Sequence, residues 1–230
     1  MGNSVRETLA AYGLNLDAPW SLGSEAFEQI CAIIRQNHYS AMVEFGSGSS
    51  TVGWALVCRD LSVTSFEHEQ PFFEQSSGLV EKFNLSERVQ VLHVPLQRCW
   101  INGRPFVSYR RTRIDPPVDV VIIDGPPHVT RRGREACLYF VYDALRVGGA
   151  VILDDYQRHD EVQIVRNWQS VYPHSFRQET LAAGQGVAVL YKVRHERRSV
   201  HYDVLRDACR VQYQQLAFGV KARLAGLRRG

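Results

Sequence analysis

Residues 43–51 read VEFGSGSST: one acid, two glycines separated by a serine, and then a cluster of hydroxyl side chains. Glycine is favoured where the chain turns tightly or where a ligand lies against the main chain. The serines and the threonine that follow are good helix N-caps. We interpret the stretch as the end of a strand that turns into a helix, with backbone N–H groups pointing at an electronegative group. Taken alone, a Gly-x-Gly pair is equally typical of a plain tight turn.

A second acid stands at the spacing that a nucleotide site requires. Glu67 follows Gly46 by 21 residues and ends the run Ser65-Phe66-Glu67. A carboxylate at this point of an α/β fold can accept both hydroxyls of a ribose. The glycine turn and Glu67 together favour an adenosine-containing ligand, and the alternative is a structural turn with a solvated glutamate.

The residues beside the turn indicate which adenosine-containing ligand to expect. A dinucleotide fingerprint has a third glycine, and Thr51 occupies that position. Glu44 precedes the turn, and a carboxylate there would repel a pyrophosphate but attract an amino or sulfonium cation. These residues point to S-adenosylmethionine rather than NAD.

Three further acids and a histidine could carry chemistry. Asp124 ends an apolar run in IIDGPPH, and Asp154-Asp155 end the next run. Because burying unpaired charge is costly, strand ends of this kind normally open into a site. Asp124, Asp154 and Asp155 could supply the hard oxygen ligands that Mg²⁺ prefers. Alternatively, Asp124 orients a ligand while Asp154 or Asp155 caps a helix. His128 titrates near neutrality and could deprotonate a substrate hydroxyl, unless it is a simple surface residue.

An aromatic and basic segment could cover the substrate. Residues 96–117 contain Asn102-Gly103 and Pro116-Pro117 and are long enough for a functional loop. The side chains that we expect at the substrate side are those of Trp20, Trp100, Phe106, Tyr109, Arg110, Arg111 and Arg113. The arginines would suit a carboxylate or a phosphorylated sugar. A solvated basic loop is the alternative.

The elements that must position these residues alternate along the chain. Helices are expected at 5–12 and from Ser24 onward, and then at about 50–58, 70–83, 130–145 and 160–171. Short apolar runs predict strands at Ala41–Phe45, Leu61–Phe66, Val89–His93, Val118–Ile123 and Ala150–Leu153. This alternation predicts a parallel sheet covered by helices on both faces. Two last strands, near Ser175–Thr180 and Gly186–Val193, are expected to form a hairpin.

The composition bounds the class of protein. The 230 residues are 45% hydrophobic and 22% charged, which is ordinary for one large globular domain. No apolar run approaches the ~20 residues of a membrane-spanning helix, and no secretory signal precedes the chain's first helix. The five cysteines have no paired spacing, so we expect a reducing, cytoplasmic location.

Together the motifs resemble those of the class I S-adenosylmethionine-dependent methyltransferases. VEFGSGSST is similar to their glycine-rich first motif, FEHEQ to the acidic second motif, VDVVIIDGPPH to the fourth-strand motif, and LRVGGAVILDDY to the Gly-Gly turn into strand five. The resemblance covers residues 24–193. It implies a Rossmann-like, seven-stranded and mostly parallel sheet with helices on both faces, in which the last hairpin adds one antiparallel strand.

The resemblance also implies roles for single residues. Glu44, Gly46 and Gly48 would hold the methionine part of the cofactor, Glu67 would bind the ribose, and His68 would lie near the adenine. The full expected cofactor-binding set is Glu44, Gly46, Ser47, Gly48, Ser50, Thr51, Glu67, His68 and Asp124. The third strand ends in LHVPL, without the acid that often binds the adenine amino group, so main-chain groups must substitute or that contact is absent. In the metal-dependent catechol-type O-methyltransferases, acids at similar strand ends hold Mg²⁺, which would give Asp124, Asp154 and Asp155 that role.

The expected function is methyl transfer from S-adenosylmethionine to a small-molecule acceptor at a hydroxyl or carboxylate oxygen, with Asp124 and His128 as catalytic residues. One alternative is an aminopropyltransferase on the same fold, although the arginine-rich 104–113 stretch argues against an acidic polyamine groove. The other is an RNA-directed methyltransferase or nucleic-acid-binding protein that uses the basic tail. That tail has few aromatic residues among its charges, which makes a nucleic-acid partner unlikely.

We divide the chain into an N-terminal helix and cover segment at 1–23, a methyltransferase domain at 24–193, and a basic helical extension at 194–230. Residues 192–230 hold ten Lys/Arg and three Asp/Glu. No proline interrupts residues 199–223, and apolar side chains recur there at helical spacing, which predicts an amphipathic helix. We expect its apolar stripe to be buried in a homodimer, with an acidic or membrane partner as the alternative.

Overall fold

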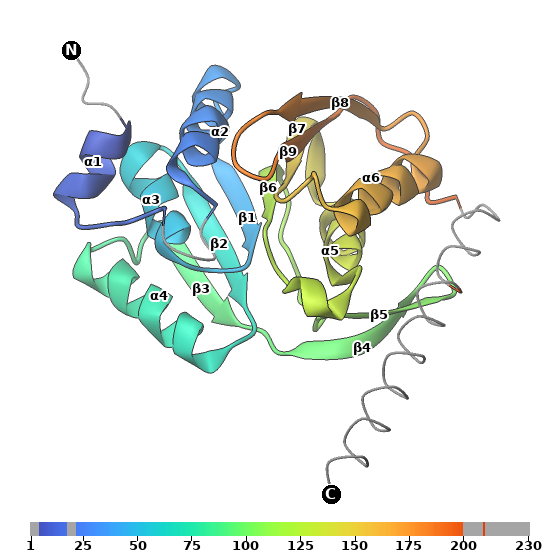
Figure 1. The fold of residues 1–230 in the computed structure, drawn as a ribbon, viewed down its shortest axis with the longest axis horizontal. Coiled ribbons are helices and arrows are strands. Elements are labelled where there is room, and N and C mark those ends of the chain that lie inside the picture. The colour runs from blue at the N-terminus through green and yellow to red at the C-terminus, as the bar shows by residue number, and fades with distance from the viewer. Residues whose placement is uncertain (1–4, 18–21, 200–208, 210–230) are drawn as a thin grey trace, which may run out of the picture.

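The computed structural model describes residues 5–17, 22–199 and 209. Seven strands form one sheet in the order β3-β2-β1-β6-β7-β9-β8 (Figure 1). The strands are β1 (Ala41–Phe45), β2 (Ser62–Glu67), β3 (Val89–His93), β6 (Val118–Ile123), β7 (Leu145–Leu153), β8 (Phe176–Leu181) and β9 (Val187–Lys192). β9 runs antiparallel to both of its neighbours, and the other neighbouring pairs of the sheet are parallel. The predicted Rossmann-like sheet with one antiparallel strand is confirmed.

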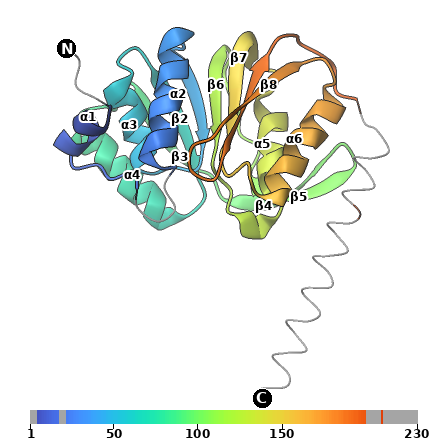
Figure 2. The ribbon, with the colours of Figure 1, turned by 45° about the horizontal axis from the view of Figure 1, so that its top comes forward.

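Helices cover both faces of this sheet. The helices are α1 (Val5–Ala11), α2 (Ser24–Gln36), α3 (Ser49–Val57), α4 (Gln70–Lys82), α5 (Gly133–Val141) and α6 (His159–Val171). Figure 2 shows α1–α4 gathered at one side of the sheet and α5 and α6 at the other. The predicted helices match these bounds within a few residues, except that α5 is shorter than the expected 130–145 segment.

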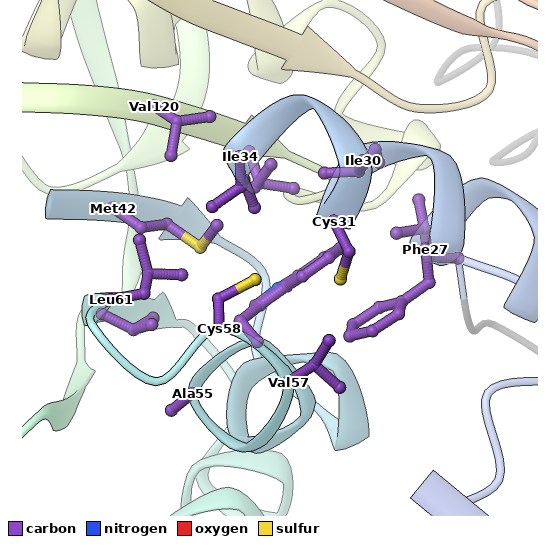
Figure 3. Packing of buried hydrophobic residues seen from close by; sticks show 14 of the residues in the cluster. Phe27, Ile30, Cys31, Ile34, Met42, Ala55, Val57, Cys58, Leu61 and Val120 are labelled. Carbon is purple, nitrogen blue, oxygen red and sulfur yellow. The ribbon is translucent and has the colours of Figure 1, made fainter. Parts of the chain in front are cut away.

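The core consists of two clusters, one on each face of the sheet. Side chains alternate along a strand, so Met42 of β1 lies in the cluster under α1–α4 and Val43 lies in the cluster under α5 and α6. Figure 3 shows part of the first cluster, where Phe27 of α2 lies near Val57 of α3 and Ile34 of α2 lies near Met42 of β1. The β6 segment Val118–Ile123 is buried throughout, as expected for a strand covered on both faces.

The segment expected to be a loop at 96–117 is instead largely a β-hairpin. β4 (Leu96–Ile101) and β5 (Arg104–Tyr109) form a separate antiparallel sheet. The turn is Asn102-Gly103, and both residues have positive φ, of 54° and 73°. Positive φ at both central residues is the requirement of a type I′ hairpin turn, which Asn-Gly favours. The loop prediction was wrong because this turn signal was interpreted as irregular structure.

A buried ion pair anchors the hairpin to the helices. Arg104 Nη1 lies 2.5 Å from Glu135 Oε1, and both side chains are almost fully buried. The Tyr139 hydroxyl donates to the same carboxylate, and Asn167 Nδ2 donates to its other oxygen at 2.8 Å. Because Glu135 belongs to α5 and Asn167 to α6, one carboxylate joins the hairpin and both helices.

The predicted boundary at residue 193 falls within packed chain. Beyond β9, Arg198 Nε donates to the Tyr172 hydroxyl at 3.0 Å, and Ser199 N donates to Val171 O at 3.0 Å. The backbone N–H of Glu196 donates to the Tyr142 hydroxyl at 2.8 Å. Residues up to 199 therefore belong to the same packed unit as the sheet. The predicted amphipathic helix at 199–223 lies outside the described residues, apart from Ser199 and the exposed Cys209, as does Trp20 of the cover segment. Among the described helices, none has the length and apolar character to cross a membrane.

Candidate functional site

The glycine turn brings two neighbouring strands into contact at their carboxyl ends. Gly46 follows β1 and has φ +100°, a value that L side chains rarely adopt. A Cβ added there would lie 2.9 Å from the backbone nitrogen of Gly125, which follows β6. Gly125 N also donates to Phe45 O at 2.6 Å. The main chains of the two motifs therefore pack directly against one another, and Gly46 leaves the turn without a side chain.

Glu67 holds this turn in place. Ser47 N donates to its Oε2 at 2.8 Å, and the backbone N–H groups of His68 and Glu69 donate to Oε1 at 2.7 and 2.9 Å. Although burial opposes it, hydrogen bonding from His68 and the backbone holds the pKa of Glu67 below its ordinary value. The carboxylate that was expected to bind a ribose is thus ionised, and it lies against the glycine turn.

Glu44 has a different surrounding from the one expected. It is 1% exposed, and its carboxylate accepts hydrogen bonds from Ser50, Thr51, Trp54 and Ser65 at 2.6–3.0 Å. A carboxylate offers about four acceptor directions. These four donors therefore occupy the acceptor directions of the Glu44 carboxylate, and its role as a cofactor-binding residue stays a prediction. The carboxylate ties the first turn of α3 to β1 and β2, and so fixes the shape of the glycine turn.

His68 lies on the far side of Glu67 from the glycine turn. Its Nδ1 is 3.0 Å from Glu67 Oε1, and its ring meets Tyr109 edge-on with centroids 6.0 Å apart. Tyr109 is 1% exposed, and a Cβ added at Gly125 would meet its hydroxyl at 2.3 Å. Tyr109 therefore supports the turn from the protein interior, and its side chain is not exposed as a residue of a cover loop would be.

The three aspartates meet at the ends of β6 and β7. One carboxylate oxygen from each of Asp124, Asp154 and Asp155 lies within 4.8 Å of the others. Burial, with repulsion from Asp124 and Asp155, raises the pKa of Asp154 to about 7. Burial also raises the pKa of Asp124, against the opposing attraction of Arg134. The sequence prediction that these acids converge is confirmed.

An arginine that the sequence analysis did not single out lies inside this acid cluster. Arg134 Nη1 is 3.0 Å from Asp155 Oδ2, and its Nη2 is 3.3 Å from Asp124 Oδ1. Its side chain is 5% exposed and is also 3.7 Å from Glu161. The available signal was the basic run RRGR at 131–134, directly after the DGPPH motif.

The acids suit Mg²⁺ by type, but their contacts do not fit the ion. Two of the three carboxylates already bind a guanidinium group, and Arg158 Nη1 contacts Asp155 Oδ2 at 2.6 Å as well. A divalent cation bound to these oxygens would lie beside two positive charges, which repel it strongly in a buried site. We therefore assign no step of the reaction to a metal.

The remaining predicted residues are divided between the surface and the core. His128 is exposed and begins a short 3-10 helix, η1 (His128–Thr130), directly beyond the DGPP turn. Arg110, Arg111 and Arg113 are exposed, and Arg113 pairs with Asp115 at 2.8 Å. Trp100 is 74% exposed, and Phe106 is buried against α5 and α6. The segment expected to cover the substrate is thus divided between core and solvent.

Known proteins resemble this arrangement. Residues 43–156 match a family model described as a methyltransferase domain. An O-methyltransferase from Bacillus cereus, solved with S-adenosylhomocysteine, is 16% identical, with 84% of this chain and 92% of that chain covered and a TM-score of 0.56. TomG from Streptomyces achromogenes, solved with S-adenosylmethionine, is 15% identical, covering 84% and 91%, with a TM-score of 0.57. The methyltransferase PaMTH1 from Podospora anserina, bound to S-adenosylhomocysteine, is 14% identical, covering 84% and 88%, with a TM-score of 0.55. A search of curated proteins gave no match.

The matched segment begins within β1 and ends beyond Asp155, so it contains the glycine turn, Glu67 and the acid cluster. Residues 43–156 therefore carry a methyltransferase domain, on the same Rossmann-like fold as the similar methyltransferase structures. The chain is an enzyme of the methyl-transferring type.

Proposed function

We propose that this enzyme transfers the methyl group of S-adenosylmethionine to an oxygen of a small-molecule acceptor. The observation that carries the proposal is the meeting of the glycine turn with the Asp124 strand end through the Gly46–Gly125 contact. A cofactor on the turn would have its sulfur side next to the acid cluster and the His128 loop. The O-methyltransferases among the similar structures support oxygen as the acceptor atom.

For the cofactor, we propose that the backbone around Gly46 and Gly48 accommodates the methionine part and that Glu67 accepts the ribose hydroxyls. Four hydrogen bonds are donated to the Glu67 carboxylate in this structure. The longest comes from the Ser47 hydroxyl, which is 3.2 Å from Oε2, and a ribose hydroxyl could replace it. His68 would then lie beside the adenine. Ser47, Ser50 and Thr51 shape the turn, and the last two do so through Glu44.

For the chemistry, we propose that alignment supplies most of the rate and that His128 removes the acceptor proton. Methyl transfer requires the acceptor oxygen, the methyl carbon and the sulfur to be in line, and correct positioning can supply several kcal/mol of the barrier, up to about 7–11. Asp124, held by Arg134, would orient the acceptor or the cofactor. His128 is exposed, so its imidazole is accessible to a bound hydroxyl, from which it would accept a proton.

We further propose that Arg134 takes the place that Mg²⁺ would hold in a metal-dependent enzyme. The guanidinium neutralises Asp124 and Asp155 from within the protein. Mg²⁺ dependence is the alternative that chelation tests.

The test is transfer of isotopically labelled methyl from S-adenosylmethionine to a panel of hydroxyl-bearing and carboxyl-bearing small molecules, with and without EDTA. We expect a methylated oxygen product and an unchanged rate after exhaustive chelation. Loss of turnover on chelation, restored by Mg²⁺, would refute the metal-free reading. Methylation of RNA but of no small molecule in the panel would refute the proposed acceptor class.

The predicted homodimer through residues 199–223 remains a proposal, since only Ser199 and Cys209 of that segment are described.

A further inference from the structure

A basic pocket lies directly beside the acid cluster. It has a volume of about 540 Å³, and it is lined by side chains of the η1 loop and of the start of α6, including His128, Arg131, Arg132 and Arg158. The loops that carry these residues follow the ends of β6 and β7, where Asp124 and Asp154 lie. The pocket is therefore on the side of the sheet edge where we place the acceptor.

Positive charge exceeds negative charge around the pocket. The two acids that line it are Asp160 and Glu161. Glu161 also faces Arg134, at 3.7 Å. Asp160 lies 3.8 Å from Arg131 and 3.9 Å from Arg132, distances beyond normal hydrogen bonds. One carboxylate is thus shared loosely between two guanidinium groups.

The backbone of the η1 loop is shaped in an unusual way at this pocket. Arg131 has φ +59° and ψ −109°, in the half of the map that favours glycine. Its N–H donates to His128 O at 2.8 Å, and Thr130 Oγ1 donates to Pro127 O at 2.8 Å. Backbone of this kind concentrates at ligand-binding segments, because the surrounding structure must hold it. Here it places His128 and Arg131 on the same pocket wall.

Arg158 connects the pocket to the reaction site. Its Nη1 contacts Asp155 Oδ2 at 2.6 Å, and its side chain is still 40% exposed. Its remaining N–H groups can therefore serve a ligand in the pocket. A guanidinium fork suits the paired oxygens of a carboxylate or a phosphate better than any neutral group.

We propose that this pocket binds an oxyanionic group of the acceptor, a carboxylate or a phosphate, through Arg131 and Arg158. The inference rests on the proposed function, because it places the acceptor's charged end here and its reacting oxygen near His128. The acceptor class is then a small acidic molecule with a separate hydroxyl or carboxyl group to be methylated.

The test uses the full chain and two matched arginine variants. Arg131→Gln removes one pocket cation, and Arg111→Gln removes a cation from an exposed segment outside the pocket. Calorimetric titrations with inorganic phosphate and with acetate are compared at constant ionic strength, because salt screens exposed charges. S-adenosylhomocysteine binding is measured separately on all three proteins.

We expect at least one of the two anions to bind the wild-type chain and Arg111→Gln alike, and its Kd to rise at least fivefold in Arg131→Gln. Binding of phosphate alone would assign a phosphorylated acceptor, and binding of acetate alone a carboxylic acid. Failure of both anions to bind the wild-type chain would overturn the proposal, and so would equal affinity in Arg131→Gln. A wild-type chain that bound phosphate through Arg131 but did not bind S-adenosylhomocysteine would support the pocket and refute the proposed function, so the two failures are distinguishable.

Discussion

At the scale of single residues, Arg134 balances the acid cluster through its contacts with Asp124 and Asp155. Asp124, Asp154 and Asp155 follow apolar runs, and parallel strands end at one edge, so their convergence could be read from the sequence. Arg134 could not be placed in the same way, because it reaches the cluster from α5 through tertiary packing. Glu44 shows the same limit. Its position beside the glycine turn was evident, but the four donors that enclose it come from separate elements.

The ionisation of Asp154 should make the free energy of unfolding depend on pH. Its pKa is raised from the ordinary value of 3.8 to about 7. Between these values the native state holds a proton that the unfolded chain has lost, so stability falls as pH rises from about 4 to about 7. Asp154→Asn removes this dependence. We expect the substitution to stabilise the protein by about 2.5 kcal/mol more at pH 8 than at pH 5, measured by urea unfolding.

The control for this experiment is Asp143→Asn, whose side chain is 77% exposed. It should change the pH dependence little. Equal effects of Asp154→Asn at the two pH values would show that Asp154 ionises normally in the folded protein.

At the scale of elements, the alternation of strands and helices was predictable because each buried strand forms an apolar run. The exceptions have local causes. β7 begins at Leu145, ahead of the predicted Ala150, because Leu145 pairs with Val118 across a register shift. The hairpin β4–β5 was missed although its Asn-Gly turn was visible in the sequence, since its strands mix exposed and buried residues and each carries an arginine.

The ion pair between Arg104 and Glu135 makes the hairpin an integral part of the fold. Removing one partner of a buried pair leaves the other charge uncompensated, which costs about 3–5 kcal/mol. We expect Arg104→Ala to lower the free energy of unfolding by about this amount. Arg98→Ala, on an exposed position of the same hairpin, should change it by no more than about 0.5 kcal/mol. Chemical denaturation of the two variants makes the comparison. A small loss in Arg104→Ala would mean that the hairpin packs on α5 without help from the ion pair.

At the scale of the whole molecule, the packed part of the chain extends past the domain boundary that we expected at residue 193. Charge composition changes near residue 192, whereas packing continues to Ser199. Composition could not reveal this difference, because Glu196 and Arg198 look like solvated tail residues until their partners Ser175 and Tyr172 are brought near.

Two truncations test where the domain ends. A chain that ends after Ser199 keeps the contacts of Glu196 and Arg198, and we expect its melting temperature to equal that of the full chain. A chain that ends after Val193 loses several hydrogen bonds worth about 0.5–1.5 kcal/mol each, and we expect a melting temperature lower by several degrees. Equal melting temperatures of the two truncated chains in differential scanning calorimetry would show that the folded domain ends at residue 193. Light scattering of the same proteins tests the proposed dimer, since only the full chain should show the mass of two copies.

The assignment of the cofactor site to the glycine turn and Glu67 is the central claim, and calorimetry of S-adenosylhomocysteine binding tests it most directly. Glu67→Ala removes the carboxylate that holds Ser47 N and that we propose binds the ribose. We expect affinity to fall by about 1.5–3 kcal/mol, the value of a charged hydrogen bond. Glu69→Ala is the control, because its side chain lies on the same turn and is 53% exposed. It should bind as the wild type does. Unchanged affinity in Glu67→Ala, or tight binding of NAD by the wild-type chain, would contradict the account.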